Sequence, residues 1–388
     1  MPRVVLGLEN FLADPREYVQ DRRVGLVVSA SSFDHRLVST VERMHAAPQV
    51  MLTALFGPEH GLRGEAQAGE KVAASRDHVT GLPVYSLYGD SRKPTPDMLA
   101  DVDVLVIDMQ DAGSRFYTYL YTMAYVMQAG AEHNRSVVVL DRPAPLGGLA
   151  VQGPVLDPAF ASFVGLYPLP VRYGMTIGEC ARLFNTAFGI GCDLTVVPMR
   201  GWQRTMWYDD TDLPFIPPSP NLPTLDSLIC YPGTCLVEGT SLSEGRGTAR
   251  PFEYIGAPWI AAPEQLAADL NALELPGVRF RAVYFRPSFS KYAGEICRGV
   301  HVFVTDRQVF HPVETGVTLL QVIKARYPAD FTWREPWTPG GHYPIDLLYG
   351  SSQLRDHLEA SLPVDALVQA WEPQCDAFEA LRADFLLY

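Results

Sequence analysis

The chain has 388 residues and a formal net charge of −13. Because domains commonly contain about 100–150 residues, this length predicts two domains or one large domain. Hydrophobic residues make up 47% of the chain and charged residues 19%, which excludes a wholly disordered protein. The negative charge and the lack of any extended lysine or arginine run argue against a nucleic-acid partner, since binding phosphates requires a basic face.

The six cysteines have irregular spacing and form no C-x-x-C pair, so neither a disulfide framework nor a zinc ribbon is predicted. We expect buried thiols in a reducing compartment. The histidines are scattered and no H-E-x-x-H occurs, so no metal site is predicted. The apolar stretch 116–131 is shorter than the roughly 20 residues that span a bilayer, and residues 1–9 lack the pattern of a secretion signal. We therefore expect a cytoplasmic protein without a membrane span.

Short β-branched runs alternate with helical patterns over the first 200 residues. The predicted strands are 24–29, 50–56, 84–87, 102–109, 137–140 and 194–197. The predicted helices are 37–47, 114–131 and 176–188, the last beginning with the capping-box residues Thr176 and Glu179. Apolar runs without polar alternation are typical of parallel strands buried on both faces. The pattern predicts a Rossmann-like, doubly wound α/β sheet.

Six prolines between positions 214 and 232 argue against a helix or a central strand there. We predict a domain boundary near residue 225, with a Rossmann-like domain at 1–225 and a smaller α/β domain at 226–388. The second domain is predicted to contain helices 263–273 and 317–327, strands 278–285 and 299–305, and two closing helices after Ser352.

Three polar clusters directly follow predicted strands: G-P-E-H-G and L-R-G-E-A-Q-A-G-E (57–70), D-M-Q-D-A-G-S-R-F-Y-T-Y (108–119) and D-R-P (141–143). Ligands of open parallel sheets bind outside the carboxyl ends of the strands, so the three clusters should meet in one crevice. No phosphate-binding glycine motif and no G-x-S-x-G occurs, which argues against an ATP or NAD site and against a serine hydrolase.

Within these clusters, Glu59 and His60 stand between proline and glycine in a tight turn, which favours a functional role. Asp108 could equally cap the following helix or belong to the site, whereas the position of Asp111 favours a cap over a catalytic role. Arg115 falls in the first turn of a predicted helix, where a cation opposes the helix dipole, so a bound anion or a neighbouring carboxylate would explain it.

A glycine-rich stretch follows the predicted boundary, Y-P-G-T-C-L-V-E-G-T-S-L-S-E-G-R-G-T at 231–248. It carries Glu238, Glu244 and Arg246. It could be an ordinary loop, but loops between domains frequently form ligand clefts.

Together with T-G-L-P-V-Y-S-L-Y-G (80–89) and P-S-P-N-L-P (218–223), these motifs resemble those of the exo-β-N-acetylmuramidases, glycoside hydrolase family 171, over nearly the whole chain. The resemblance implies a Rossmann-like N-terminal catalytic domain, a smaller C-terminal α/β domain and an active site in the cleft between them. It also implies release of terminal N-acetylmuramic acid from the non-reducing end of peptidoglycan fragments, without a cofactor, in cell-wall turnover or recycling. The substrate would be a muropeptide-derived disaccharide or the end of a glycan strand.

By the same resemblance the catalytic glutamate is Glu59. His60 would orient it or bind a sugar hydroxyl, and Asp108 is the third residue expected to be catalytic. The motif residues expected to bind substrate are Arg63, Glu65, Gln110, Asp111, Arg115, Tyr117, Asn221, Glu238, Glu244 and Arg246. One departure is Gln152, where relatives often carry a glutamate.

Glycoside hydrolysis needs a proton donor and usually a second carboxylate. Glu59 could be the donor or the nucleophile, and the 2-acetamido group of the substrate could replace the second carboxylate. The candidates for that carboxylate are Asp108, Asp111, Glu65 and Glu244. The arginines expected to bind the lactyl carboxylate of the substrate are Arg63, Arg115 and Arg246. Two alternatives remain: a non-catalytic binding protein for an anionic amino sugar, and a nucleotide-dependent enzyme.

Overall fold

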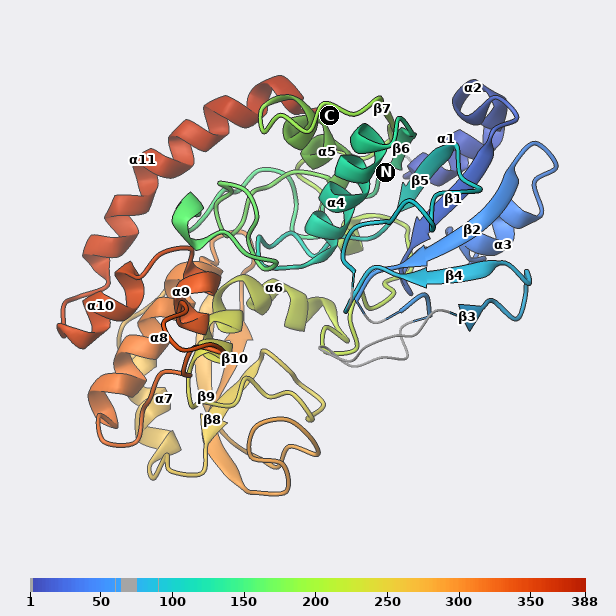
Figure 1. Ribbon diagram of the computed structural model, residues 1–388. Coiled ribbons are helices and arrows are strands. Elements are labelled where there is room, and N and C mark those ends of the chain that lie inside the picture. The colour runs from blue at the N-terminus through green and yellow to red at the C-terminus, as the bar shows by residue number, and fades with distance from the viewer. Residues whose placement is uncertain (1–2, 60, 64–74, 90) are drawn as a thin grey trace.

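The computed structural model describes residues 3–59, 61–63, 75–89 and 91–388. These residues form a seven-stranded sheet in the order β3-β4-β2-β1-β5-β6-β7 and a three-stranded sheet in the order β8-β10-β9 (Figure 1). The large sheet comprises β1 (Arg23–Val28), β2 (Met51–Gly57), β3 (Ser75–Arg76), β4 (Pro83–Ser86), β5 (Val104–Asp108), β6 (Ser136–Leu140) and β7 (Leu194–Val197). All of its strand pairs are parallel except β3 with β4, which confirms the predicted fold class.

Helices cover both faces of the large sheet. They are α1 (Gly7–Ala13), α2 (Pro15–Val19) and α3 (Thr40–His45) on one face, and α4 (Tyr119–Glu132) and α5 (Ile177–Thr186) on the other. Along β1, Leu26 packs with the first group and Val27 with the second, because neighbouring side chains of a strand point to opposite faces. This two-sided burial explains why the strand sequences lack polar alternation.

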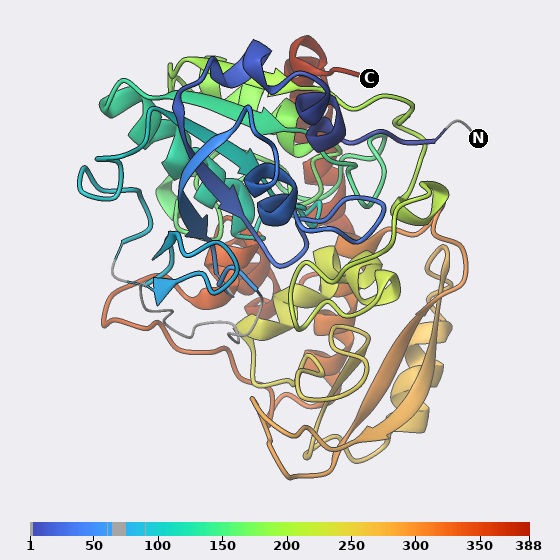
Figure 2. The ribbon, with the colours of Figure 1, turned by 90° about the vertical axis from the view of Figure 1, so that its right-hand side faces the viewer.

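The small sheet is antiparallel and consists of β8 (Tyr254–Ala257), β9 (Val278–Phe285) and β10 (Cys297–Val304). Helix α7 (Pro263–Asn271) packs against β9 and β10, and Figure 2 shows this unit at the lower right, apart from the strands of the large sheet. Burial alternates along β9, as expected of a strand with one solvated face. The short strands β3 and β8 have no counterpart in the sequence predictions.

Two predictions about helix positions near the site are wrong. Helix α6 (Leu225–Thr234) begins within the proline-rich stretch that was predicted to exclude helix, with Thr224 capping its start and Pro232 in its last turn. A proline there removes only one of the final hydrogen bonds of a short helix. Helix α4 begins at Tyr119 and not at residue 114, so Arg115 lies in the buried loop before it. The helix-dipole explanation for Arg115 therefore does not apply.

The chain ends with four further helices: α8 (Pro312–Arg326), α9 (Pro344–Tyr349), α10 (Gln353–Glu359) and α11 (Asp365–Arg382). Helix α11 runs along one side of the molecule and brings the C-terminus back to α5 and the large sheet (Figure 1). There Arg382 donates to the main-chain oxygens of Tyr173 and Gly174 at 2.9 and 2.7 Å, and the hydroxyl of Tyr388 donates to Asp141 at 2.7 Å. The last residues thus pack on the predicted first domain although they belong in sequence to the second.

All six cysteines are free thiols, and five of them are buried, which confirms their predicted structural character. In the part of the chain that the structure describes, no helix has the length and apolarity needed to cross a membrane.

Candidate active site

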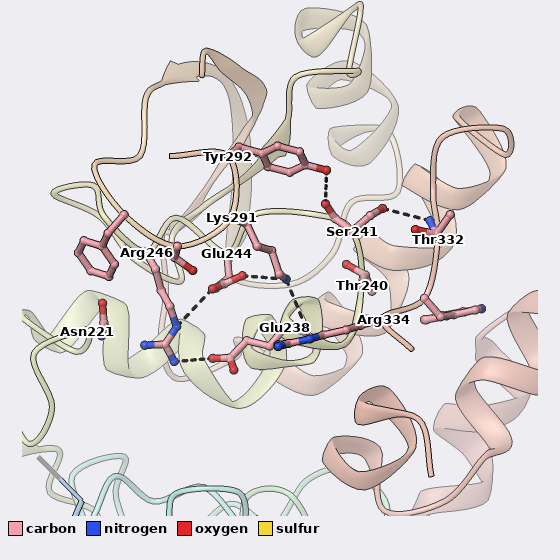
Figure 3. A pocket seen from close by; sticks show the side chains of 13 residues that line it. Asn221, Glu238, Thr240, Ser241, Glu244, Arg246, Lys291, Tyr292, Thr332 and Arg334 are labelled. Atoms are coloured by element: carbon pink, nitrogen blue, oxygen red, sulfur yellow. Dashed lines mark hydrogen bonds and ion pairs between the residues drawn. The ribbon is translucent and has the colours of Figure 1, made fainter. Parts of the chain in front are cut away.

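Two cavities share Glu238 and Arg246 as wall residues. The larger one, about 730 Å³, is lined by five side chains of the segment 238–246, by residues 289–292 and 332–334, and by Asn221 (Figure 3). The smaller one, about 130 Å³, has Glu59, Tyr117 and Thr118 in its wall as well. The smaller cavity therefore brings the turn after β2 and the loop before α4 together with the glycine-rich stretch of the second half.

Glu59 follows β2 directly and is held by groups from two other segments. Its Oε2 accepts a hydrogen bond of 2.9 Å from the hydroxyl of Thr118, and its main-chain oxygen accepts one of 3.3 Å from Tyr119. Tyr88, just after β4, also bonds to its carboxylate: burial and then the charge and hydrogen bond of Glu59 raise the pKa of Tyr88 to about 12. The Tyr88 hydroxyl consequently stays neutral and can donate to Glu59 at all physiological pH values.

A charged network forms the opposite wall of the site. Arg246 donates to Glu238 Oε1 at 2.6 Å, and its Nε lies 3.2 Å from Glu244 Oε1. Lys291 Nζ lies 3.1 Å from Glu244 Oε2 and donates to the main-chain oxygen of Leu242 at 2.7 Å. Burial alone would lower the pKa of Arg246, but Glu238 and Glu244 outweigh it and raise this pKa. Both carboxylates thus form ion pairs with the same guanidinium.

The glycines of E-G-R-G have a conformational reason. Gly245 and Gly247, on either side of Arg246, both have φ of +79°, a left-handed conformation that residues with a Cβ rarely adopt. A Cβ at Gly245 would lie 2.6 Å from the main-chain oxygen of Tyr254. The two glycines let the chain turn sharply enough to place the Arg246 side chain between its two carboxylates.

Asp108, predicted to be catalytic, occupies a different place. It is completely buried, and its carboxylate accepts hydrogen bonds from Arg142 Nε at 2.5 Å and Arg142 Nη2 at 2.8 Å. The hydroxyl of Thr40 donates to the same carboxylate. Asp108 lines neither cavity. The structure gives it the role of an internal ion pair that joins the ends of β5 and β6.

Arg115, predicted to bind substrate, also lies away from the cavities. Its guanidinium is completely buried and donates to four main-chain oxygens, those of Pro154, Leu169, Leu348 and Tyr349, at 2.6–2.9 Å. Burial lowers the pKa of Arg115 to about 10. This arginine thus joins residues 154–169 to α9. The structure gives no support to the prediction that Arg115 binds substrate.

Gln110 and Asp111 hold the same loop internally. Gln110 Nε2 donates to the main-chain oxygen of Pro143 at 2.9 Å. Asp111 Oδ2 accepts hydrogen bonds from the Tyr173 hydroxyl and, at 2.8 Å, from the amide of Gly113. Burial raises the pKa of Asp111 to about 6 in spite of these donors. Neither residue lines one of the two cavities.

The remaining predicted residues divide into three groups. Tyr117, Asn221, Glu238, Glu244 and Arg246 line one or both cavities. Arg63 lies apart from them: it pairs with Asp77 at 2.5 Å and lines a separate cavity of about 180 Å³ at the end of β1. His60 and Glu65 lie outside the described residues.

Sequence reasoning missed four side chains of this site. Thr118 and Tyr88 stand inside the motifs quoted above, but nothing local distinguishes them from packing residues. Lys291 and Arg334 come from segments without a motif, and only the fold brings them to the larger cavity.

Gln152 lines another cavity of about 400 Å³ with residues of α8 and α11. Its main chain pairs with that of Arg172, and the side chains of the two residues are 3.4 Å apart. A carboxylate at this position would not face the cavity of Glu59. Among the described residues, no cluster of histidine, cysteine and acidic side chains is suited to hold a metal ion.

The site contains the carboxyl groups needed for acid–base catalysis of bond cleavage in a polar ligand. Glu59 is a carboxyl group oriented by hydroxyl donors, and Glu238, paired with Arg246, lies in the wall of the same small cavity. Two carboxyl groups on a shared cavity are the usual requirement for cleaving a glycosidic bond.

Comparisons with known proteins agree with this geometry and confirm the resemblance seen in the sequence. Residues 24–226 match the family model described as exo-beta-N-acetylmuramidase NamZ, N-terminal, and residues 229–388 match its C-terminal counterpart. The peptidoglycan beta-N-acetylmuramidase NamZ of Bacillus subtilis (strain 168) is 48% identical over 387 residues, which is 100% of this chain and 92% of that protein.

Two crystal structures of DUF1343 family proteins from Bacteroides fragilis are similar over 100% of this chain and 99% of each of theirs. The first has a TM-score of 0.90 at 37% sequence identity, and the second a TM-score of 0.76 at 29% identity.

Proposed function

The chain belongs to the exo-β-N-acetylmuramidase NamZ family, and from this premise we propose that it hydrolyses the bond between a terminal N-acetylmuramic acid and the rest of a peptidoglycan fragment, at the non-reducing end. The observation that carries the proposal is the small cavity in which Glu59 shares a wall with Glu238 and Arg246. Both halves of the chain are needed to build it.

We assign to Glu59 the protonation of the leaving oxygen. Its Oε2 accepts a hydrogen bond from Thr118, and the carboxyl group lies in the wall of the small cavity, where it can reach a bound substrate. The hydroxyls of Thr118 and Tyr88 fix the orientation of the carboxyl group, so that little conformational freedom is lost when the substrate binds.

Glu238 is the best-placed second carboxylate. It lines both cavities and is ion-paired with Arg246, and a carboxylate beside the sugar ring stabilises the positive charge that develops as the glycosidic bond breaks. Glu244 does not act on the substrate directly, because its two oxygens are bound by Arg246 and Lys291; it holds these two cations in place.

The decisive experiment replaces Glu59 by glutamine, which keeps the shape of the side chain and removes the transferable proton. We expect E59Q to keep the thermal midpoint of the wild type and to lose about 10²–10⁴-fold in turnover of a chromogenic β-N-acetylmuramide. Glu17→Gln, on the exposed surface of α2, makes the same chemical change away from the site and should leave turnover unchanged.

If a folded E59Q variant keeps more than one tenth of the wild-type turnover, a residue other than Glu59 is the proton donor. If the wild-type protein binds N-acetylmuramic acid but releases no product at any pH, the alternative of a non-catalytic binding protein is correct.

A further inference from the structure

We propose that Arg334 binds the carboxylate of the substrate and thereby makes the site selective for an acidic amino sugar over its neutral counterpart. The inference rests on the proposed function, because it concerns the same substrate. N-acetylmuramic acid differs from N-acetylglucosamine by a lactyl ether that carries a carboxylate. A protein with a net charge of −13 repels anions overall, so this selectivity requires a local cation that is free to bind.

The arginines singled out in the sequence are already engaged. Arg63 pairs with Asp77, and Arg246 pairs with both Glu238 and Glu244. Arg115 is enclosed by main-chain oxygens, as described above. Binding a substrate carboxylate with any of the three would first require breaking contacts that the fold itself uses.

Arg334 is different, because its backbone is held while its guanidinium enters no ion pair among the described residues. Its amide donates to the main-chain oxygen of Gly239 at 2.9 Å. Two residues earlier, Thr332 is joined to Ser241 by main-chain and side-chain hydrogen bonds of 2.9 and 3.1 Å. The guanidinium carbon lies 6.0 Å from the centroid of the Trp337 ring.

The side chain of Arg334 lines the larger cavity, and Figure 3 shows it extending from the segment of Thr332 toward the side of the cavity where Glu238 lies. It thus approaches the wall that the larger cavity shares with the smaller one. Because the two cavities share Glu238 and Arg246, a ligand held by Arg334 would lie beside the residues that also border the small cavity of Glu59.

The charges of the larger cavity favour an anion. Its wall contains three cations, Arg246, Lys291 and Arg334, and two carboxylates, Glu238 and Glu244. The carboxylates are neutralised by Arg246 and Lys291, so the charge of Arg334 remains uncompensated within the wall. A guanidinium can bind a carboxylate through two parallel hydrogen bonds, which gives both affinity and orientation.

Arg92 is the principal competitor. It is exposed, and its guanidinium lies 4.1 Å from the centroid of the Phe163 ring. Its charge acts to lower the pKa of Tyr88, a neighbour of Glu59. It has no ion pair among the described residues, but it lines neither of the two cavities. It therefore enters the test as the rival residue.

The test compares Arg334→Gln and Arg334→Lys with the wild type on a β-N-acetylmuramide and a β-N-acetylglucosaminide that carry the same leaving group. We expect R334Q to lower kcat/KM for the muramide by roughly tenfold to a hundredfold, the effect of one charge-assisted hydrogen-bond pair, and to leave kcat/KM for the glucosaminide unchanged. R334K should be intermediate, because lysine keeps the charge but lacks the planar fork.

Calorimetric binding of free N-acetylmuramic acid and N-acetylglucosamine gives a second readout that does not depend on turnover. R334Q should lose the preference for the acidic sugar. The matched control is Arg279→Gln, which removes the same charge from an exposed position on β9 away from both cavities and should change nothing.

Equal losses on both substrates, or a selective loss in Arg92→Gln with R334Q unaffected, would overturn the proposal. A wild-type protein that hydrolyses neither substrate but binds N-acetylmuramic acid in an Arg334-dependent way would refute the proposed function and support this inference. The two failures are therefore distinguishable.

Discussion

Asp141 shows how strongly a single buried carboxylate can be tied into the fold. It lies at the end of β6 and accepts hydrogen bonds from the Thr176 hydroxyl at 2.8 Å, the Gly178 amide at 2.7 Å and the Tyr388 hydroxyl at 2.7 Å. Burial nevertheless raises the pKa of Asp141 to about 7 from its ordinary value of 3.8, because the loss of solvent outweighs these hydrogen bonds.

This raised pKa predicts a pH dependence of stability. The folded state binds the Asp141 proton more tightly than the unfolded state does, so the stabilisation is complete below about pH 4 and is lost as the pH rises through about 7. We expect the free energy of unfolding in urea to fall between pH 5 and pH 8, and to fall less steeply in Asp141→Asn. Asp111, with its pKa raised to about 6 by burial, contributes in the same direction and leaves a residual slope. Parallel pH profiles of the two proteins would contradict this assignment.

Helices α6 and α8 cross with main chain against main chain, and two glycines make this possible. A Cβ at Gly233 of α6 would lie 1.8 Å from the main-chain oxygen of Pro312, the first residue of α8. A Cβ at Gly316 of α8 would lie 2.3 Å from the main-chain oxygen of Gly233. Since α6 also begins within the proline-rich stretch that contains Asn221, this crossing helps to position the wall of the larger cavity.

The close crossing predicts an unusual sign for a glycine-to-alanine change. In an unobstructed helix this change stabilises by about 0.5–1 kcal/mol, because glycine loses more conformational entropy on folding. Gly233→Ala should instead destabilise by about 1–3 kcal/mol or more, because α8 must move away from α6. Thermal denaturation measures the difference. Gly165→Ala, where the nearest atoms belong to the Leu156 side chain at 3.3 Å, is the control with a much smaller cost, and an unchanged midpoint for G233A would exclude the tight crossing.

At the scale of the whole molecule, the two halves share one apolar core. A continuous cluster of buried side chains extends from one face of the large sheet through α6, α8 and the small sheet to α11. The C-terminal residues then return to the large sheet, where the amide of Leu387 donates to Glu179 at 2.8 Å and Arg182 donates to the main-chain oxygen of Phe385 at 2.9 Å. The second half is thus joined to the first both through the shared core and through its C-terminal residues.

This organisation predicts that the chain unfolds as a unit. Calorimetry of the full chain should show one transition, and removal of residues 383–388 should lower its midpoint without splitting it, because the lost contacts belong to the common core. Turnover of the muramide should be lost at the same temperature as the secondary structure. Two separated transitions, with turnover lost in only one of them, would show that the halves unfold independently.

Much of the fold could be read from local sequence. The β-branched runs at 50–56 and 137–140 predicted buried parallel strands, because a strand covered on both faces has no polar positions. Thr176 and Glu179 predicted the start of α5, because a capping box is satisfied within four residues. The turn of Glu59 was recognisable since a carboxylate between proline and glycine at a strand end has no local structural purpose.

Only the tertiary structure decided which charges meet. Asp108 pairs with Arg142, 34 positions away in the chain, and Lys291 reaches Glu244 over 47 positions. Such pairings depend on how strands and loops assemble, and the residues themselves carry no local signal of their partner. The guanidinium of Arg115, which suggested a bound anion, therefore finds its partners inside the fold. Arg334 lies in a segment without any motif, and it lines the cavity because its amide bonds to the chain beside Glu238.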